Sequence, residues 1–233
     1  MPTKIEWCEE TWNPITGCTP ISEGCQNCYA KRMANRLRGR YGYSEIEPFQ
    51  ITRHHKSYFY PPMQNWGKPR IIFVCSMGDL WHKQVPQHWI DGVLDKARRY
   101  SQHTYLFLTK RPERIRFWAF PNNAWVGVTI EHQKYLQERM NYLYSCRANI
   151  KFISAEPMLS NIDISEHEGI FDWVICGAET GPGARYMEPK WAENLYEQCQ
   201  KAGVPFFFKK ASKGDTLDLP REYPNPCQRP GNE

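Results

Sequence analysis

Three of the nine cysteines are spaced closely enough to bind one metal group together. Cys18, Cys25 and Cys28 form the pattern C-x6-C-x2-C in a segment that also carries glycine and proline. Those residue types indicate a loop, which can bring three thiolates around a common point. An apolar i, i+4, i+8 repeat starts at Tyr29 and predicts a helix directly after the loop. The dipole at the N-terminus of that helix would favour thiolate charge.

The number of clustered thiolates distinguishes two kinds of metal site. A closed structural zinc site needs four ligands, and no fourth lies at pair-like spacing. His54, His55, Cys75 or His82 could supply it from a distance, and the rival zinc protein would most readily use Cys8, Cys75 or His82. A [4Fe–4S] cluster on three cysteines leaves one iron open to an external ligand. Three thiolates without a nearby fourth therefore favour an iron–sulfur cluster, and a zinc site is the alternative.

Short apolar runs alternate with helical patterns after this loop. The runs are continuously apolar, which is typical of a parallel sheet buried on both faces. One of the helical patterns between these runs begins at Pro189 and ends at Gly203. The alternation of strands and helices predicts an α/β fold, either an open doubly wound sheet or a barrel. The expected strands are residues 11–17, 70–75, 105–108, 125–129, 150–153, 173–176 and 205–208.

Polar or charged residues follow nearly every expected strand. In a barrel, the carboxyl ends of the strands meet at one mouth, where active sites are built. Helix capping and loop solvation are the alternative for single members of the set. The residues are Ser76, Asp79, Thr109, Lys110, Arg111, Thr129, Glu131, Ser154, Glu156, Glu179, Thr180, Lys209 and Lys210.

Composition limits the class of protein. The 233 residues are 41% hydrophobic and 24% charged, which is typical of a globular chain rather than a disordered or fibrous one. No apolar run reaches the ~18 residues of a membrane span and no secretory leader is visible, so we expect a cytoplasmic protein without a membrane partner. The net charge of +5 is compatible with a polyanionic partner.

Several motifs in a fixed order make the sequence similar to a known family. Together they cover nearly the whole chain and resemble a family of phage-associated three-cysteine-motif proteins. Members of that family are mostly of unknown function and are commonly grouped, by analogy, with radical S-adenosylmethionine (SAM) enzymes. The common radical SAM pattern is C-x3-C-x2-C with a Gly-Gly-Glu turn after the second strand, and both features differ here. The motifs are WNPITGC (12–18), GCQNCYA (24–30), SMGDL (76–80), LTKRP (108–112), WVGV (125–128), SAEP (154–157), DWVICGAETG (172–181) and FFFK (206–209).

The resemblance implies a single radical-SAM-like domain over residues 1–233, with a partial (β/α)6 TIM-like barrel. It implies a [4Fe–4S] cluster on the three clustered cysteines, SAM on the fourth iron and an external electron donor. The reaction would be reductive cleavage of SAM to a 5′-deoxyadenosyl radical that takes hydrogen from a substrate. Residues 41–69 interrupt the strand–helix rhythm and are interpreted as an insertion or lid, and residues 211–233 as a C-terminal surface wrap.

Within that scheme, the residues at the strand ends are expected to bind cofactor and substrate. For Lys110 and Arg111, surface salt bridges are the alternative. The expected cofactor contacts are Ser76 and Asp79 for the SAM amino group, Lys110 or Arg111 for its carboxylate, and Thr109, Glu131 and Glu179 for the ribose hydroxyls; the expected substrate contacts are Glu156, Arg185 and Lys209.

The substrate stays open, and nucleic acid is one hypothesis. Basic residues crowd the helix expected after Cys28, and aromatic residues are interleaved with them, a combination that binds phosphates and bases. Solvated charge over a small aromatic core is the alternative. The competing functions are a zinc-stabilised nucleic-acid-binding protein without redox chemistry and an iron–sulfur protein that serves a partner enzyme. The basic residues are Lys31, Arg32, Arg36, Arg38, Arg40, Arg53 and Lys56, with His54 and His55 before the last.

Overall fold

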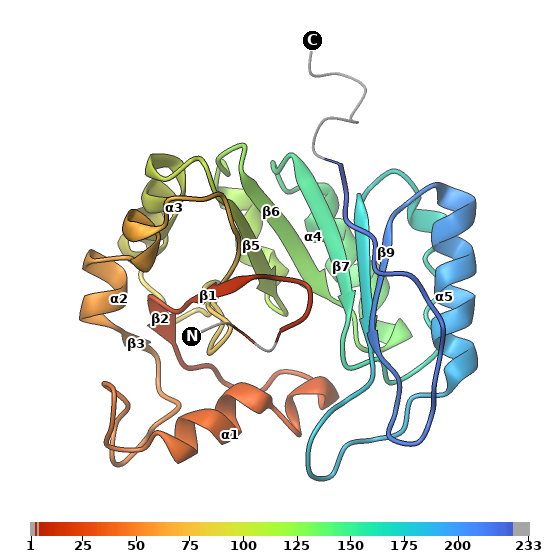
Figure 1. Cartoon of the computed structure of the whole chain (residues 1–233), viewed down its shortest axis with the longest axis horizontal. Helices are drawn as coiled ribbons and strands as arrows, with labels where there is room; N and C mark the ends of the chain where they lie inside the picture. The colour runs from red at the N-terminus through yellow and green to blue at the C-terminus, as the bar shows by residue number, and fades with distance from the viewer. Residues whose placement is uncertain (1–2, 4, 226–233) are drawn as a thin grey trace.

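A curled parallel sheet of seven strands forms the body of the protein (Figure 1). The structure is a computed structural model that describes residue 3 and residues 5–225. Neighbouring strands are parallel and their order in the sheet is their order in the chain, which produces the shape of half a barrel. The strands are β1 (Glu10–Trp12), β4 (Ile71–Val74), β5 (Thr104–Thr109), β6 (Ala124–Thr129), β7 (Ile150–Ala155), β8 (Trp173–Gly177) and β9 (Phe206–Lys210).

The strands expected from apolar runs are confirmed, with one correction. Each of the six runs after residue 69 forms a strand of the parallel sheet. The single first strand expected at residues 11–17 is wrong: Pro14 cannot donate a ladder hydrogen bond, and the chain leaves the sheet there. After it, β2 (Ile15–Thr16) pairs antiparallel with β3 (Thr52–Arg53). The seven-stranded sheet has β1 and β9 as its two edges.

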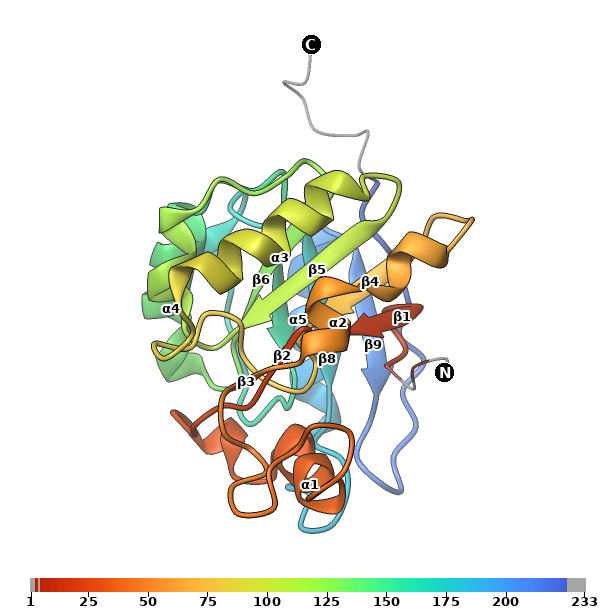
Figure 2. The ribbon, with the colours of Figure 1, turned by 90° about the vertical axis from the view of Figure 1, so that its left-hand side faces the viewer.

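Helices cover the convex face of the sheet. Figures 1 and 2 show α3 (Gln87–Arg99), α4 (Leu136–Tyr144) and α5 (Pro189–Ala202) around the outside of the curl. The last of these begins with proline and ends at Gly203, whose φ of +65° suits glycine at a helix C-terminus. The connections from β5 to β6 and from β7 to β8 are the 3₁₀ helices η3 (Pro112–Phe117) and η5 (Ser165–His167), so the strand–helix alternation is incomplete.

Side chains alternate between the two faces of the sheet and build two separate cores. Phe107 and Val126 belong to the larger core under the helices. Their neighbours Leu106 and Trp125 belong to a second core inside the curl, to which Trp7 of the N-terminal segment is added. Both faces of the sheet are therefore covered, as the continuously apolar strands indicate.

The segment expected as an insertion lies beside both α3 and the cysteine loop. It contains β3, α2 (His55–Phe59) and η2 (Pro62–Asn65). The Tyr58 hydroxyl is 3.2 and 3.3 Å from the carbonyl oxygens of His88 and Trp89 and donates to this first turn of α3. At its other end, the carbonyl of Phe49 accepts a hydrogen bond of 3.3 Å from the amide of Cys18. The segment thus joins the cysteine loop to the outer layer.

The C-terminal segment covers the edge strand β9. The amide of Phe208 donates to the carbonyl of Pro220 at 2.8 Å, and Arg221 forms an ion pair with Glu6 at 2.7 Å. An exposed parallel edge is a site for unwanted pairing, which this segment blocks. Residues 226–233 of the expected wrap, Cys227 among them, lie outside the described residues. In the described part of the chain, no helix combines the length and apolarity needed to cross a bilayer.

Replacing Gly127 with alanine is expected to destabilise the fold by about 1–3 kcal/mol. A Cβ at Gly127 of β6 would lie 2.5 Å from ring carbons of Phe152, which is fully buried inside the curl. Urea unfolding followed by tryptophan fluorescence measures the change. Gly67→Ala is the matched control, because a Cβ at Gly67 meets no atom within 4 Å. Equal unfolding free energies for the two variants would contradict this packing.

Candidate functional site

The loop that carries Cys18, Cys25 and Cys28 lies against the carboxyl ends of the strands. Figures 1 and 2 show α1 (Tyr29–Arg36), which follows the loop, across the end of the sheet toward which the strand arrows point. The amide of Gly17, just before the loop, donates to the carbonyl of Met77, after β4, at 3.0 Å. The cysteines and the polar residues at the strand ends therefore meet at one end of the sheet.

Two glycines allow close backbone contacts of the loop, one with the segment 41–69 and one with the end of β4. Gly17 has a φ of +91°, and a Cβ there would lie 2.0 Å from the carbonyl oxygen of Gln50. A Cβ at Gly78 would lie 2.7 Å from the carbonyl oxygen of Gly17. Because Gly78 carries no side chain, the backbone of the loop packs directly on the backbone that follows β4, and Gly17 in the same way allows the contact with Gln50.

Arg111 fastens the loop to the end of β5. Its guanidinium donates to the carbonyl and the hydroxyl of Thr19 at 2.8 and 2.9 Å, and Nη1 lies 3.8 Å from Cys18 Sγ. The amide of Arg111 donates to Thr109 Oγ1 at 2.8 Å, and the Thr109 hydroxyl donates to the buried carboxylate of Asp79 at 2.8 Å. Asp79 and Thr109, both expected as SAM contacts, are thus bound to each other and hold the loop.

Local charge and burial affect the cysteine thiols differently. Burial raises the pKa of Cys18 to about 12, and the Asp79 carboxylate adds to that effect. Burial also opposes ionisation of Cys25, but the Lys110 ammonium and hydrogen bonds within the loop outweigh it and lower the pKa of this thiol. The cations at the end of β5 are therefore the groups that favour thiolates in the loop.

The three thiols are electrostatic neighbours that do not converge on one point. Both Cys25 and Cys28 influence the pKa of Cys18. The Cys18 thiol donates to the carbonyl of Thr19 at 3.4 Å, and Cys25 Sγ lies 3.6 Å from Ser22 Oγ. Within residue 3 and residues 5–225, no three His, Cys, Asp or Glu side chains are arranged to hold a metal ion. Joint binding of one group by the three thiols would require them to turn away from these partners.

The half-buried Lys110 and the fully buried Glu131 form a pair beneath the loop. Glu131 Oε1 lies 3.9 Å from Lys110 Nζ, and Oε2 lies 2.5 Å from Nη1 of Arg139 on α4. Burial would raise the pKa of Glu131, but the charges of Lys110 and Arg139 hold it below its ordinary value. A Cβ at Gly24 would lie 2.8 Å from Lys110 Nζ and 2.9 Å from Glu131 Cγ, so the loop rests directly on this pair.

Glu179 and Arg185 bind each other and the cysteine loop. Arg185 donates from Nε and Nη2 to the Glu179 carboxylate at 2.9 and 2.5 Å, and Asn27 Nδ2 donates to it at 2.9 Å. Burial would raise the pKa of Glu179, but Arg185 and Asn27 lower it to about 2. Sequence reasoning assigned the two residues to different ligands, whereas the structure pairs them as an anchor.

The remaining expected residues lie in two places. Glu156 and Lys209 are on the concave face of the sheet, and Ser76 is beside the connection from β1 to β2. Glu156 and Lys209 form an ion pair, and Trp7 Nε1 donates to Glu156 at 3.4 Å. Alternation along β9 from Phe207, a member of the inner core, places Lys209 on the concave face. The Ser76 hydroxyl donates instead to Asn13 Oδ1 at 3.2 Å, in the connection from β1 to β2.

Sequence reasoning missed several partners of the expected residues. Asn27, Arg139 and Trp7 each donate a hydrogen bond to the carboxylate of an expected site residue. These carboxylates are Glu179, Glu131 and Glu156, in that order. The position of Asn27 between two of the clustered cysteines was an available signal. Arg139 lies between the apolar positions Leu136 and Met140 of one helix, where a charge indicates a buried partner, although the pattern does not identify that partner.

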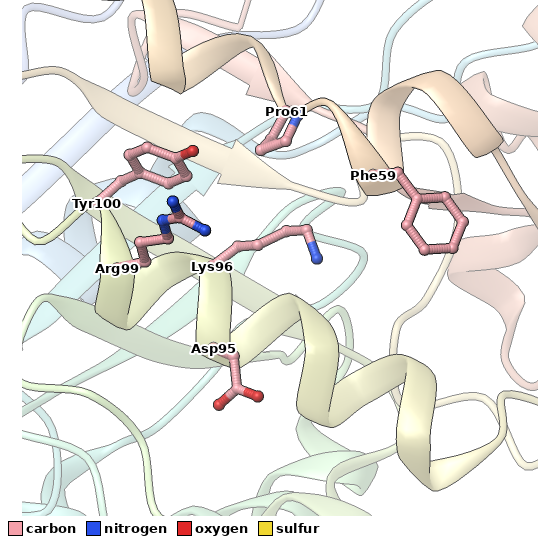
Figure 3. Close-up of a pocket in the computed structure, with 6 residues that line it drawn as sticks. All are labelled: Phe59, Pro61, Asp95, Lys96, Arg99 and Tyr100. Atoms are coloured by element: carbon pink, nitrogen blue, oxygen red, sulfur yellow. The ribbon is translucent and has the colours of Figure 1, made fainter.

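Two surface hollows are lined by other residues. The first, of about 220 Å³, lies between α2, η2 and the end of α3 (Figure 3). Its Lys96 already donates to the carbonyl of Gly92 at 3.3 Å and lies 4.5 Å from the ring centre of Tyr58. The second, of about 230 Å³, lies between η4 (Gln133–Tyr135), the start of α4 and η5. Neither is lined by a cysteine or by an expected site residue.

The fold and the site define an α/β protein with a cysteine-bearing loop at the carboxyl ends of a curled parallel sheet. The chain belongs to the family described as "Protein of unknown function (DUF5131)", which matches residues 2–220. No curated protein and no solved structure matches the chain. The family description assigns no activity.

Acid is expected to weaken the anchor at Glu179. Its pKa is about 2 in the folded protein, against about 4.3 for an unperturbed glutamate. The stabilisation is therefore complete above about pH 4.3 and is lost as the pH falls toward about 2. The unfolding free energy, measured in urea at each pH, should fall more steeply for the wild type than for Glu179→Gln. Glu193→Gln, an exposed change on α5, should follow the wild type. Parallel pH profiles for all three proteins would contradict the anchor.

Proposed function

We propose that this protein is a cytoplasmic iron–sulfur enzyme of the radical SAM type, in which Cys18, Cys25 and Cys28 hold a [4Fe–4S] cluster with SAM beside it. The observation that carries the proposal is the position of the three-thiol loop over the carboxyl ends of a parallel sheet, where α/β proteins build their active sites. The likeness to phage-associated and radical SAM proteins, and the assignment of the sheet to a partial (β/α)6 TIM-like barrel, are parts of this proposal.

The chemistry of the donors fits such a cluster. Three thiolates carry negative charge, and the positive groups around them offset it: Arg111 beside Cys18, Lys110 close to Cys25, and the N-terminus of α1. A cluster held by Cys18, Cys25 and Cys28 would supply one-electron reduction, with electrons from an external donor, for reductive cleavage of SAM and radical chemistry on a substrate.

The residues of the chain itself would position the reactants. The hydrogen-bonded series from Asp79 through Thr109 to Arg111 keeps the loop at the strand ends. The Lys110–Glu131 and Glu156–Lys209 pairs offer both signs of charge, which suits a ligand with an ammonium and a carboxylate, such as the methionyl part of SAM. The aromatic inner core closes the other end of the curl and excludes water from that side.

Replacing Cys25 with alanine is expected to abolish cluster assembly. After anaerobic reconstitution with iron and sulfide, the wild type should contain about four irons per chain. Cys25→Ala should contain less than about a quarter of that, because two thiolates cannot hold the cluster. Cys199→Ala, a buried change on α5, is the control and should load normally. Normal iron content and absorbance in Cys25→Ala would refute the ligand assignment.

The reaction itself has a separate readout. Reduced, reconstituted wild-type protein incubated with SAM should release 5′-deoxyadenosine, measured by mass spectrometry, and Cys25→Ala should release none. An iron-loaded wild type that releases none would contradict the enzyme and leave an iron–sulfur protein that serves a partner.

A zinc-stabilised nucleic-acid-binding protein is the second candidate, because His82 adjoins the loop. Its Nε2 lies 2.9 Å from Thr19 Oγ1, and the ring is fully buried. The other two expected fourth ligands pack in the hydrophobic cores, Cys8 with the inner one and Cys75 with the outer. Colourless protein with one zinc per chain, lost in both Cys25→Ala and His82→Ala, would favour this candidate over the cluster.

A further inference from the structure

The net positive charge of the chain is concentrated in one segment beside the cysteine loop. Residues 29–56 contain seven Lys or Arg and two Glu. Removing these from the 30 basic and 25 acidic residues of the whole chain leaves 23 of each, so the net charge of +5 lies in this segment. The segment begins with α1, directly after Cys28.

The cations of this segment are not neutralised by carboxylates. Among the described residues, none of the seven forms an ion pair. Backbone carbonyls hold some of them instead: Arg38 donates to the carbonyl of Ile46 at 3.1 Å, and Arg32 to that of Thr180 at 3.1 Å. Such bonds fix the position of a guanidinium and leave its charge available to an anion.

Exposed aromatic rings lie among these cations. Tyr29 is 52% exposed and Tyr41 is 81% exposed. Tyr41 also has a φ of +53°, in the left-handed region that bulky residues rarely adopt. A backbone that accepts this strain while it holds a ring in solvent indicates a ring placed for a ligand rather than for the core. Figure 2 shows α1 and the loop after it beyond the end of the sheet, where a long ligand could reach both.

We propose that α1 and the loop after it bind single-stranded nucleic acid. The exposed cations Lys31, Arg36 and Arg40 would contact phosphates, and Tyr29 and Tyr41 would stack on unpaired bases. A duplex satisfies the cations but not the rings, because its bases are already stacked. A strand bound here passes next to the cysteine loop. Its identity as the enzyme's substrate rests on the proposed function, whereas the binding does not.

Salt dependence tests the phosphate contacts. Fluorescence anisotropy with labelled mixed-sequence DNA and RNA single strands, about 12 nucleotides long, gives the affinity at each salt concentration. Each phosphate contact adds about 0.7 to the slope of log affinity against log salt. A triple variant should therefore lower the slope of log affinity against log salt by about 2 and weaken binding at least about tenfold at low salt. Its changes are Lys31→Gln, Arg36→Gln and Arg40→Gln. Stronger binding of one strand type identifies the nucleic acid.

A matched variant controls for the overall change of charge. Lys68→Gln, Lys190→Gln and Lys201→Gln remove three exposed lysines from other parts of the chain. This control should bind like the wild type, because its charges do not touch the strand. Equal affinities and slopes for the two triple variants, or wild-type binding that is absent or indifferent to salt, would overturn the proposal.

Tyr41→Gly tests the stacking ring separately from the fold. Glycine adopts a positive φ without steric cost, so the melting temperature should not fall. Loss of one base stack should weaken strand binding by about fivefold or more. Tyr41→Trp should restore it. Unchanged affinity in Tyr41→Gly, or a blunt duplex bound as tightly as a single strand, would overturn the stacking.

The outcomes separate this inference from the proposed function. Strand binding by a protein that loads iron but releases no 5′-deoxyadenosine would support the binding surface and contradict the enzyme. Release of 5′-deoxyadenosine by a protein that binds no strand would support the enzyme and contradict the binding surface.

Discussion

The position of the cysteine loop depends on one hydrogen-bonded series, from Asp79 through Thr109 and Arg111 to Thr19. Each member is at a strand end or in the loop, so the rigid sheet determines where Cys18 lies. Burial raises the pKa of Asp79, although the Thr109 hydroxyl and the Arg111 charge oppose that effect. A buried polar group of this kind is costly unless its partners are complete, and this makes the arrangement specific.

Charge is used in two ways at this end of the protein. Under the loop, oppositely charged side chains are paired, as in Lys110 with Glu131 and Glu179 with Arg185. On α1 and the loop after it, Arg32, Arg38 and Arg40 donate to backbone carbonyls instead. The paired charges set the internal geometry of the site and attract nothing at long range. The uncompensated ones create a positive field on the outer side of the same loop, which favours an approaching polyanion.

The strands and the meeting of polar residues at one end of the sheet could be predicted because both follow from local patterns. A continuous apolar run indicates a buried parallel strand, and parallel strands place their carboxyl ends together. Pro14 was a local signal for the break after β1, but the pairing of Ile15–Thr16 required knowledge of a distant partner, the Thr52–Arg53 strand. The pairing of Glu179 with Arg185 could not be predicted either. The residue types at strand ends show which groups can form ion pairs, but they do not show which side chains the fold places next to each other.

The identity of strand order and chain order has a consequence for how the protein assembles on the ribosome. From β4 onward, each strand finds the preceding one already in place, so the sheet can grow in the direction of synthesis with only short loops to close. The contact between Glu6 and Arg221 is different, because it joins opposite ends of the described chain. Until translation reaches Arg221, the C-terminal segment cannot cover β9, and the uncovered edge of the sheet is open to pairing with another chain.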